Sequence, residues 1–134
     1  MKVVIRQTPT QRRAAYALGR IRAKGELGEK YKSYVSSLGA DILTLGLGQA
    51  MAGELQAAAG SNSDGKAHLS LYDDIEKWLC SSDPLAPFPH ATNLLDAICN
   101  AEQANYLRAH SEALAVLEWL KKFARALLVD RNTG

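Results

Sequence analysis

Long apolar runs, aromatic residues and cysteines are all scarce in this 134-residue sequence. No stretch approaches the roughly 18 uninterrupted apolar residues that a membrane span requires, and the opening MKVVIRQTPTQ lacks the apolar core of a signal peptide. We therefore expect a cytoplasmic protein that does not associate with membranes. Aromatic residues amount to only 7%, whereas alanine and leucine are frequent, which favours close-packed helices over a β-sandwich or barrel.

The two cysteines, Cys80 and Cys99, are too few for a disulfide scaffold. We expect them to be buried apolar thiols in a reducing compartment, with a single bridge as the alternative. The sequence does not decide whether they pair.

Motifs for nucleotide, metal or nucleophilic chemistry are incomplete. Residues 60–67, GSNSDGKA, miss a P-loop because Ala67 has no hydroxyl for Mg²⁺, and the preceding ELQAAA is a helix former rather than a buried strand. In GLGQAMAG, Met51 stands where a dinucleotide fingerprint needs its third glycine. The three histidines and two cysteines do not follow a zinc spacing, and no nucleophile elbow occurs. We expect no catalytic residue, no metal and no cofactor.

Hydrophobic spacing predicts one all-α domain, a bundle of five or six helices over residues 1–134 with an ordered core at about 9–128. The first helix, about 9–24, begins with Thr8 and Gln11 at capping-box spacing. The second, about 28–38, is expected to end at Gly39.

The nearly uncharged segment 40–59 alternates like a strand at its start, but its length and alanine content favour a helix. Because it is apolar nearly all round, we expect it at the centre of the bundle. Further helices are predicted at 67–80, 93–100 and 102–128, loops at 60–66 and 81–90, and a frayed tail at 129–134.

Positive charge is concentrated near the N-terminus. Residues 1–32 hold nine Lys and Arg against Glu26 and Glu29, whereas residues 33–134 hold seven against twelve acids. On the first helix, the basic residues project away from the apolar side that includes Ala17 and Ile21. Such a face suits a polyanion, but a solvated cationic helix is an equally common explanation.

Three segments together resemble the small α-helical subunit of the type III-B CRISPR effector, the Cmr complex: TQRRAAYALGRI, YKSYVSSLGADILTLGLGQAMAG and YLRAHSEALAVLEWLKKFARALL. The resemblance spans most of the chain. It implies a non-catalytic antiviral-defence subunit that stacks with copies of itself and other Cmr subunits along the channel for guide RNA and target RNA. RNA cleavage would belong to other subunits.

On this interpretation, basic side chains neutralise RNA phosphates without reading bases. The RNA-binding candidates are Arg12, Arg13, Arg20, Lys24, Lys30, Lys32, Lys121, Lys122 and Arg125, with Gln11 and Tyr16 as interface candidates.

Two alternatives come from other classes of protein. A helical adaptor would dock an acidic protein on the same basic face without binding nucleic acid. A helix-turn-helix repressor fits poorly, because the helix expected after Gly39 is apolar rather than basic. The Lys121, Lys122 and Arg125 cluster is weaker evidence than the N-terminal face, since cations near a helix end also favour the helix dipole.

Overall fold

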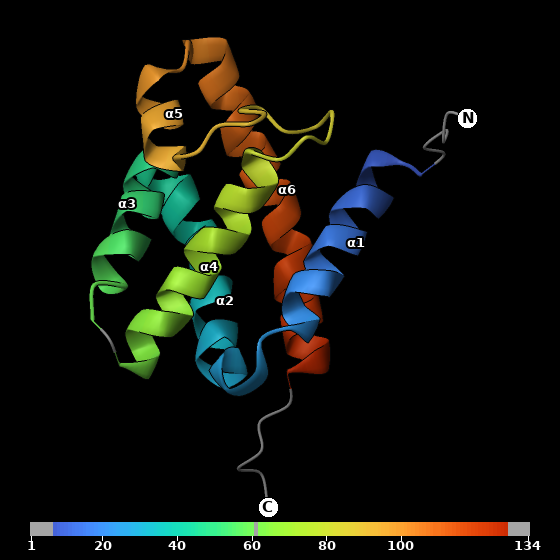
Figure 1. The fold of residues 1–134 in the computed structure, drawn as a ribbon, viewed down its shortest axis with the longest axis vertical. Coiled ribbons are helices and arrows are strands. Elements are labelled where there is room, and N and C mark those ends of the chain that lie inside the picture. Colours follow the sequence, from blue (N-terminus) through green and yellow to red (C-terminus); the bar gives the residue numbers. More distant parts are fainter. Residues whose placement is uncertain (1–6, 61, 129–134) are drawn as a thin grey trace, which may run out of the picture.

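The structure is a computed structural model that describes residues 7–60 and 62–128. The protein is helical almost throughout these residues (Figure 1). These ranges contain six α-helices, one short 3-10 helix and no strand, which confirms the all-α bundle. In chain order the elements are α1 (Pro9–Arg22), η1 (Gly25–Leu27), α2 (Gly28–Leu45), α3 (Leu47–Ala57), α4 (Ser63–Leu79), α5 (Leu94–Asn100) and α6 (Gln103–Leu127).

The predicted capping box at the start of α1 is present. The Thr8 hydroxyl accepts a hydrogen bond from the Gln11 amide at 3.1 Å, and the Gln11 side chain accepts one from the Thr8 amide at 2.8 Å. Pro9 occupies the first helical position, where a missing N–H costs nothing. Gln11 therefore has a structural role in its own helix.

The prediction that Gly39 ends the second helix is wrong. α2 continues to Leu45, and the break comes at Gly46, whose φ of 88° is a conformation that favours glycine. The segment 40–59 is thus divided between α2 and α3 rather than forming one central helix. Leu43 and Leu45 are 70% and 53% exposed, so this segment is not enclosed on all sides.

α4 also starts earlier than expected, at Ser63 rather than Ala67. The Asn62 side chain caps it by accepting a hydrogen bond from the Gly65 amide at 2.8 Å. This shortens the predicted loop at 60–66. The predicted tail at 129–134 lies outside the described residues.

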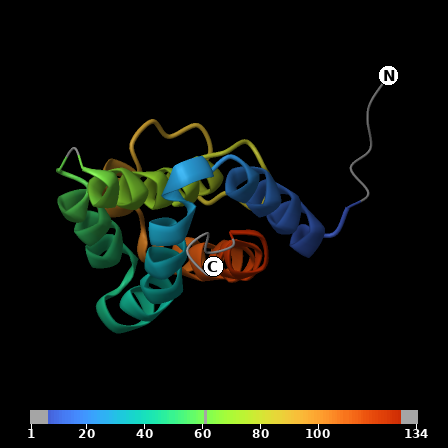
Figure 2. The same cartoon turned by 90° about the horizontal axis from the view of Figure 1, so that it is seen from below.

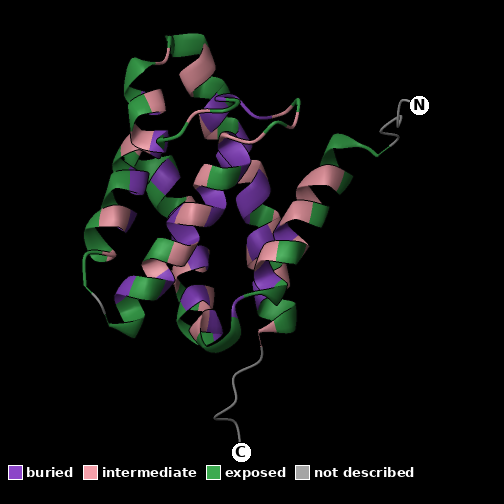
Figure 3. Ribbon diagram, viewed as in Figure 1, coloured by how far each residue is buried: buried purple, intermediate pink, exposed green. Residues whose placement is uncertain are grey.

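The core lies where α6 packs against α1, α2 and α4, and the buried sides of these helices face one another (Figure 3). α1 lies along one edge of the bundle in both perpendicular views (Figure 2). On α6, Leu127 is 48% exposed in the final turn. The side chains of α6 that face the core are buried or half-buried: Tyr106, Ala109, Ala113, Val116, Leu117, Leu120 and Ala124.

The two cysteines are both free thiols. Cys80 is half-buried at the end of α4, whereas Cys99 is exposed on α5, contrary to the expected burial of both. Burial, together with the nearby Glu76 charge, raises the pKa of the Cys80 thiol to about 11.

We therefore expect Cys99 to react with a thiol reagent at pH 8 at least about tenfold faster than Cys80. With a pKa of about 11, only about one Cys80 thiol in a thousand is the reactive thiolate at that pH. A time course with Ellman's reagent measures both rates, and the same reaction in urea serves as the control in which the rates converge. A single fast phase that accounts for both thiols of the folded protein would contradict the burial assigned to Cys80.

Candidate nucleic-acid interface

The first two candidate arginines of α1 are engaged inside the protein. Arg12 forms an ion pair with Asp83 at 3.0 Å. Arg13 binds both carboxylate oxygens of Glu112 at 2.7 and 2.8 Å, and the Trp78 indole N–H donates to the same carboxylate at 2.9 Å. Such bidentate pairing is the strong form of an arginine–carboxylate contact.

Arg20 of α1 and Lys24, which follows the end of this helix, both bind Asp74 of α4. The Asp74 side chain is completely buried. Arg20 Nε lies 2.5 Å from one carboxylate oxygen, and Lys24 Nζ lies 2.6 Å from the other. The Tyr31 hydroxyl donates to Asp74 at 2.6 Å, and burial beside this carboxylate raises the pKa of Tyr31. Burial lowers the pKa of Lys24, while the pairing with Asp74 opposes that shift. Asp74 is thus the charge centre that fixes α1 to α4.

The expectation that these four side chains point outward is therefore wrong. A helical projection separates the apolar from the polar side of α1, but it does not tell which polar flank meets a neighbouring helix. That flank faces acids from α4, the following loop and α6. Tyr16, an interface candidate, lies on it too: its hydroxyl donates to the Asp74 carbonyl at 2.6 Å, and its ring packs on Trp78.

Two further candidates lie at the start of α2. Lys30 is exposed and paired with Asp64 at 2.5 Å. Lys32 donates to the Leu128 carbonyl at 3.0 Å, which joins the start of α2 to the end of α6.

The remaining candidates lie in the last turns of α6. Lys121 is 3.5 Å from Glu118 across one turn, and Lys122 is exposed. Arg125 is also exposed and contacts the Ser36 hydroxyl at 3.4 Å. These weak contacts leave the positive charge available to an external anion, because exposed pairs contribute little.

Sequence reasoning missed Arg22, which is exposed in the last turn of α1. The ends of α1 and α6 and the start of α2 lie at the same end of the bundle (Figure 1). We call the exposed or half-exposed cations there, apart from the closely paired Lys30, the cationic strip; its members are Arg22, Lys32, Lys121, Lys122 and Arg125.

The cationic strip combines an excess of positive charge with few internal partners. Within residues 7–60 and 62–128, its one ion pair is the exposed contact between Lys121 and Glu118. Glu26 and Glu29 are exposed at the same end, so the strip is a local excess of cations rather than a uniformly positive surface. Arg22 and Arg125 also complement the dipoles of their own helices.

Other polar clusters are accounted for by packing. His68 Nδ1 lies 2.7 Å from the buried Glu54, and its ring stacks on Tyr34 with the centroids 3.7 Å apart. In the P-loop look-alike, residues 63–67 belong to α4, and Gly65 approaches the Gly60 carbonyl too closely for any side chain. Among the described residues, no group of three or more His, Cys, Asp or Glu side chains is placed to hold a metal ion.

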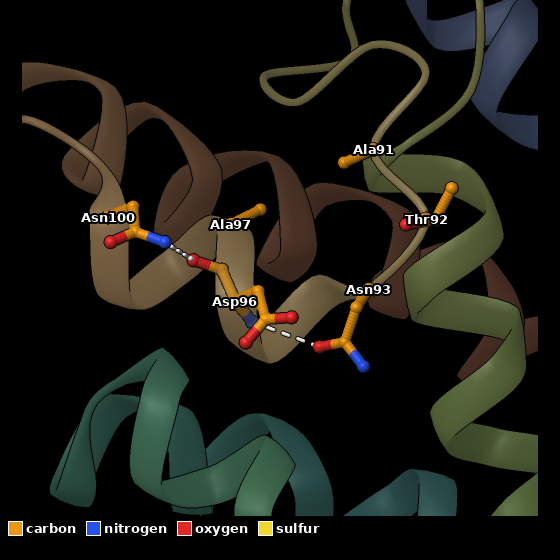
Figure 4. Close-up of a pocket in the computed structure, with 6 residues that line it drawn as sticks. All are labelled: Ala91, Thr92, Asn93, Asp96, Ala97 and Asn100. Atoms are coloured by element: carbon orange, nitrogen blue, oxygen red, sulfur yellow. Dashed lines mark hydrogen bonds between the residues drawn. The ribbon is translucent and has the colours of Figure 1, made fainter.

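A surface hollow of about 300 Å³ lies beside α5 (Figure 4). Two of its polar side chains stabilise α5 itself, because the Asn93 side chain accepts from the Asp96 amide and the Asn100 side chain donates to the Asp96 carbonyl. The hollow thus reflects the two ends of a seven-residue helix. In the described ranges, no helix has the length and apolar character needed to cross a membrane.

Comparison with known proteins agrees with this architecture. Residues 9–127 match the family described as CRISPR-associated protein (Cas_Cmr5). The chain is 35% identical over 117 residues to the CRISPR system Cmr subunit Cmr5 of Thermus thermophilus, which covers 87% of this chain and 90% of that protein. The crystal structure of a Cmr5 family protein from the same organism matches with a TM-score of 0.69 and 31% identity, over 90% of this chain and 98% of the other. The chain therefore belongs to the Cmr5 family of CRISPR-associated proteins, as the three segments of its sequence predicted.

Proposed function

We propose that this chain is a non-catalytic structural subunit of a Cmr effector complex, which stacks with copies of itself and with other Cmr subunits and contacts guide or target RNA. The observation that carries the RNA contact is the cationic strip, where five cations from three helix ends have few internal partners. Contacts of lysine and arginine with phosphates are independent of base sequence. Such contacts suit a subunit that must accept any target paired to the guide.

This proposal moves the RNA contact away from the paired cations of α1 and keeps only Arg22, in the last turn of that helix. Arg12, Arg13, Arg20 and Lys24 are already neutralised by carboxylates of the same chain. Releasing them to a phosphate would leave Asp74 buried without its cations, which is costly. Lys30 is exposed but has two close partners, Asp64 at 2.5 Å and the Ser63 hydroxyl at 2.9 Å, whereas Lys121 is 3.5 Å from Glu118; we therefore place Lys30 outside the contact.

The test is to replace the five cations of the cationic strip, Arg22, Lys32, Lys121, Lys122 and Arg125, with alanine and to measure the target-RNA affinity of a reconstituted effector at several salt concentrations. We expect weaker binding across unrelated guide and target pairs, and a slope of log K against log salt that flattens by about 0.7 for each lost single-strand contact. The matched control replaces Lys66 and Lys77, exposed cations of α4, and should bind as wild type does.

A second function, a protein adaptor, is favoured by the exposed Leu43, Leu45 and Leu107, since exposed leucines suit contact with another protein. The same experiment separates the two. If the alanine variant no longer enters the complex while the other subunits still bind RNA, the cationic strip docks an acidic protein. If both incorporation and the salt slope equal those of wild type, the strip is a solvated surface and the RNA proposal is wrong.

A further inference from the structure

Residues 23–27, which include η1, connect α1 to α2. Ala23, Lys24, Leu27 and Gly28 all have negative φ values and ψ values between −43° and 2°, which are at or near helical geometry. Gly25, between them, has a positive φ of 56°. A change of this residue to helical torsions would make one continuous helix from Pro9 to Leu45, about 55 Å long at 1.5 Å per residue.

The surface that receives α1 is specific because of its charges. α1 contributes only two fully buried apolar side chains, Ala17 and Ile21. Its docking surface presents Asp74 from α4, Asp83 from the next loop and Glu112 from α6, each bound to a cation of α1. We call these three carboxylates, with the Trp78 ring beside them, the acidic groove.

We propose that α1 exchanges between two copies of this chain. Gly25 adopts helical torsions in both copies, and each α1 then docks in the acidic groove of the other. The groove selects this occupant, since the spacing of its carboxylates already matches Arg12, Arg13, Arg20 and Lys24. Every α1 contact is retained in the exchanged dimer, and the turn at Gly25 is replaced by helix. This dimer requires no RNA and no other Cmr subunit, so it stands apart from the proposed function.

Charge reversal provides the first test. The arm variant carries Arg12→Glu and Arg13→Glu, and the groove variant carries Asp83→Arg and Glu112→Arg. Each variant alone places like charges against each other. In an exchanged heterodimer, the charge-reversed α1 of the arm variant docks in the charge-reversed groove of the groove variant, and the two unaltered elements pair with each other, so the repulsion is relieved. We expect a one-to-one heterodimer when the two full-length variants are unfolded, mixed and refolded, as measured by size exclusion with mass detection.

A chain that carries all four substitutions is the control, because it matches its own arm to its own groove without a partner. It should fold, as judged by circular dichroism, and it should not require mixing to do so. If this chain folds but the mixture yields no heterodimer, exchange does not occur and the proposal is overturned.

Gly25→Ala provides a second test that leaves all the ion pairs intact. No atom lies within 4 Å of a Cβ at Gly25, so the substitution acts on the backbone: it disfavours the positive φ and favours the continuous helix. We expect the dimer association constant, measured by analytical ultracentrifugation, to rise roughly 5- to 30-fold. Gly19→Ala is the matched control, since Gly19 lies inside α1 with open space around it, and it should leave that constant unchanged. An unchanged constant in Gly25→Ala would overturn the proposal even if the charge-reversed chains failed to fold.

Discussion

Replacing Asp74 with alanine is expected to lower the free energy of unfolding by about 3–5 kcal/mol. The substitution removes the carboxylate that pairs with Arg20 and Lys24 and accepts the Tyr31 hydroxyl. Lys24 is the main source of the loss, because its side chain is only 4% exposed and cannot recover its hydration without movement of α1. Urea unfolding followed by circular dichroism measures the change.

Asp73→Ala is the matched control for this prediction. Asp73 is the preceding residue on α4, is half-exposed, and forms no ion pair with another described residue. Its removal should change the free energy of unfolding by well under about 1 kcal/mol. Similar losses in the two variants would show that Asp74 is not the charge centre assigned here.

Replacing Gly65 with alanine is expected to destabilise the protein by about 2–4 kcal/mol. A Cβ at this position would overlap the Gly60 carbonyl oxygen and lie 2.9 Å from the carbonyl carbon. Both are backbone atoms, so the connection before α4 must shift. That shift would also disturb the hydrogen bond by which Asn62 caps the helix. Thermal and urea unfolding both report the loss.

Gly53→Ala serves as the control. Gly53 lies within α3, no atom would lie within 4 Å of a Cβ added there, and alanine is the better helix former by about 1 kcal/mol. We expect this variant to be as stable as wild type or more so. If Gly65→Ala unfolded at the same urea concentration as Gly53→Ala, the close backbone contact would not exist in solution.

Short-range chemistry predicted the start of α1 but not that of α4, where the local cap by Asn62 was not recognised. Thr8, Pro9 and Gln11 act on their own first turn, so α1 starts where the capping pattern places it. Short-range chemistry could not tell whether Gly39 or Gly46 ends the second helix. A glycine ends a helix only when its backbone adopts a non-helical conformation, and the surrounding packing that decides this includes the Tyr106 hydroxyl near Gly46.

The candidate site was predicted less well than the fold. Periodicity identified α1 as amphipathic, but the direction of its cations depended on acids that lie 54, 71 and 99 residues further along the chain. Arg22 was missed because it stands in the same basic run as the paired residues, and only the packed structure distinguishes it from them. The resemblance identified the family, but it did not indicate which surface would contact RNA under the proposed function.

The ion pairs of α1 also fix the order in which the protein can be completed during synthesis. Arg13 leaves the ribosome 99 residues before its partner Glu112. At about 5–20 residues per second, that interval is roughly 5–20 s. Asp74 and Asp83 emerge during this interval, but Glu112 and the α6 surface against which α1 packs emerge only at its end. The first helix to be translated thus completes its native packing only after the last helix has been made.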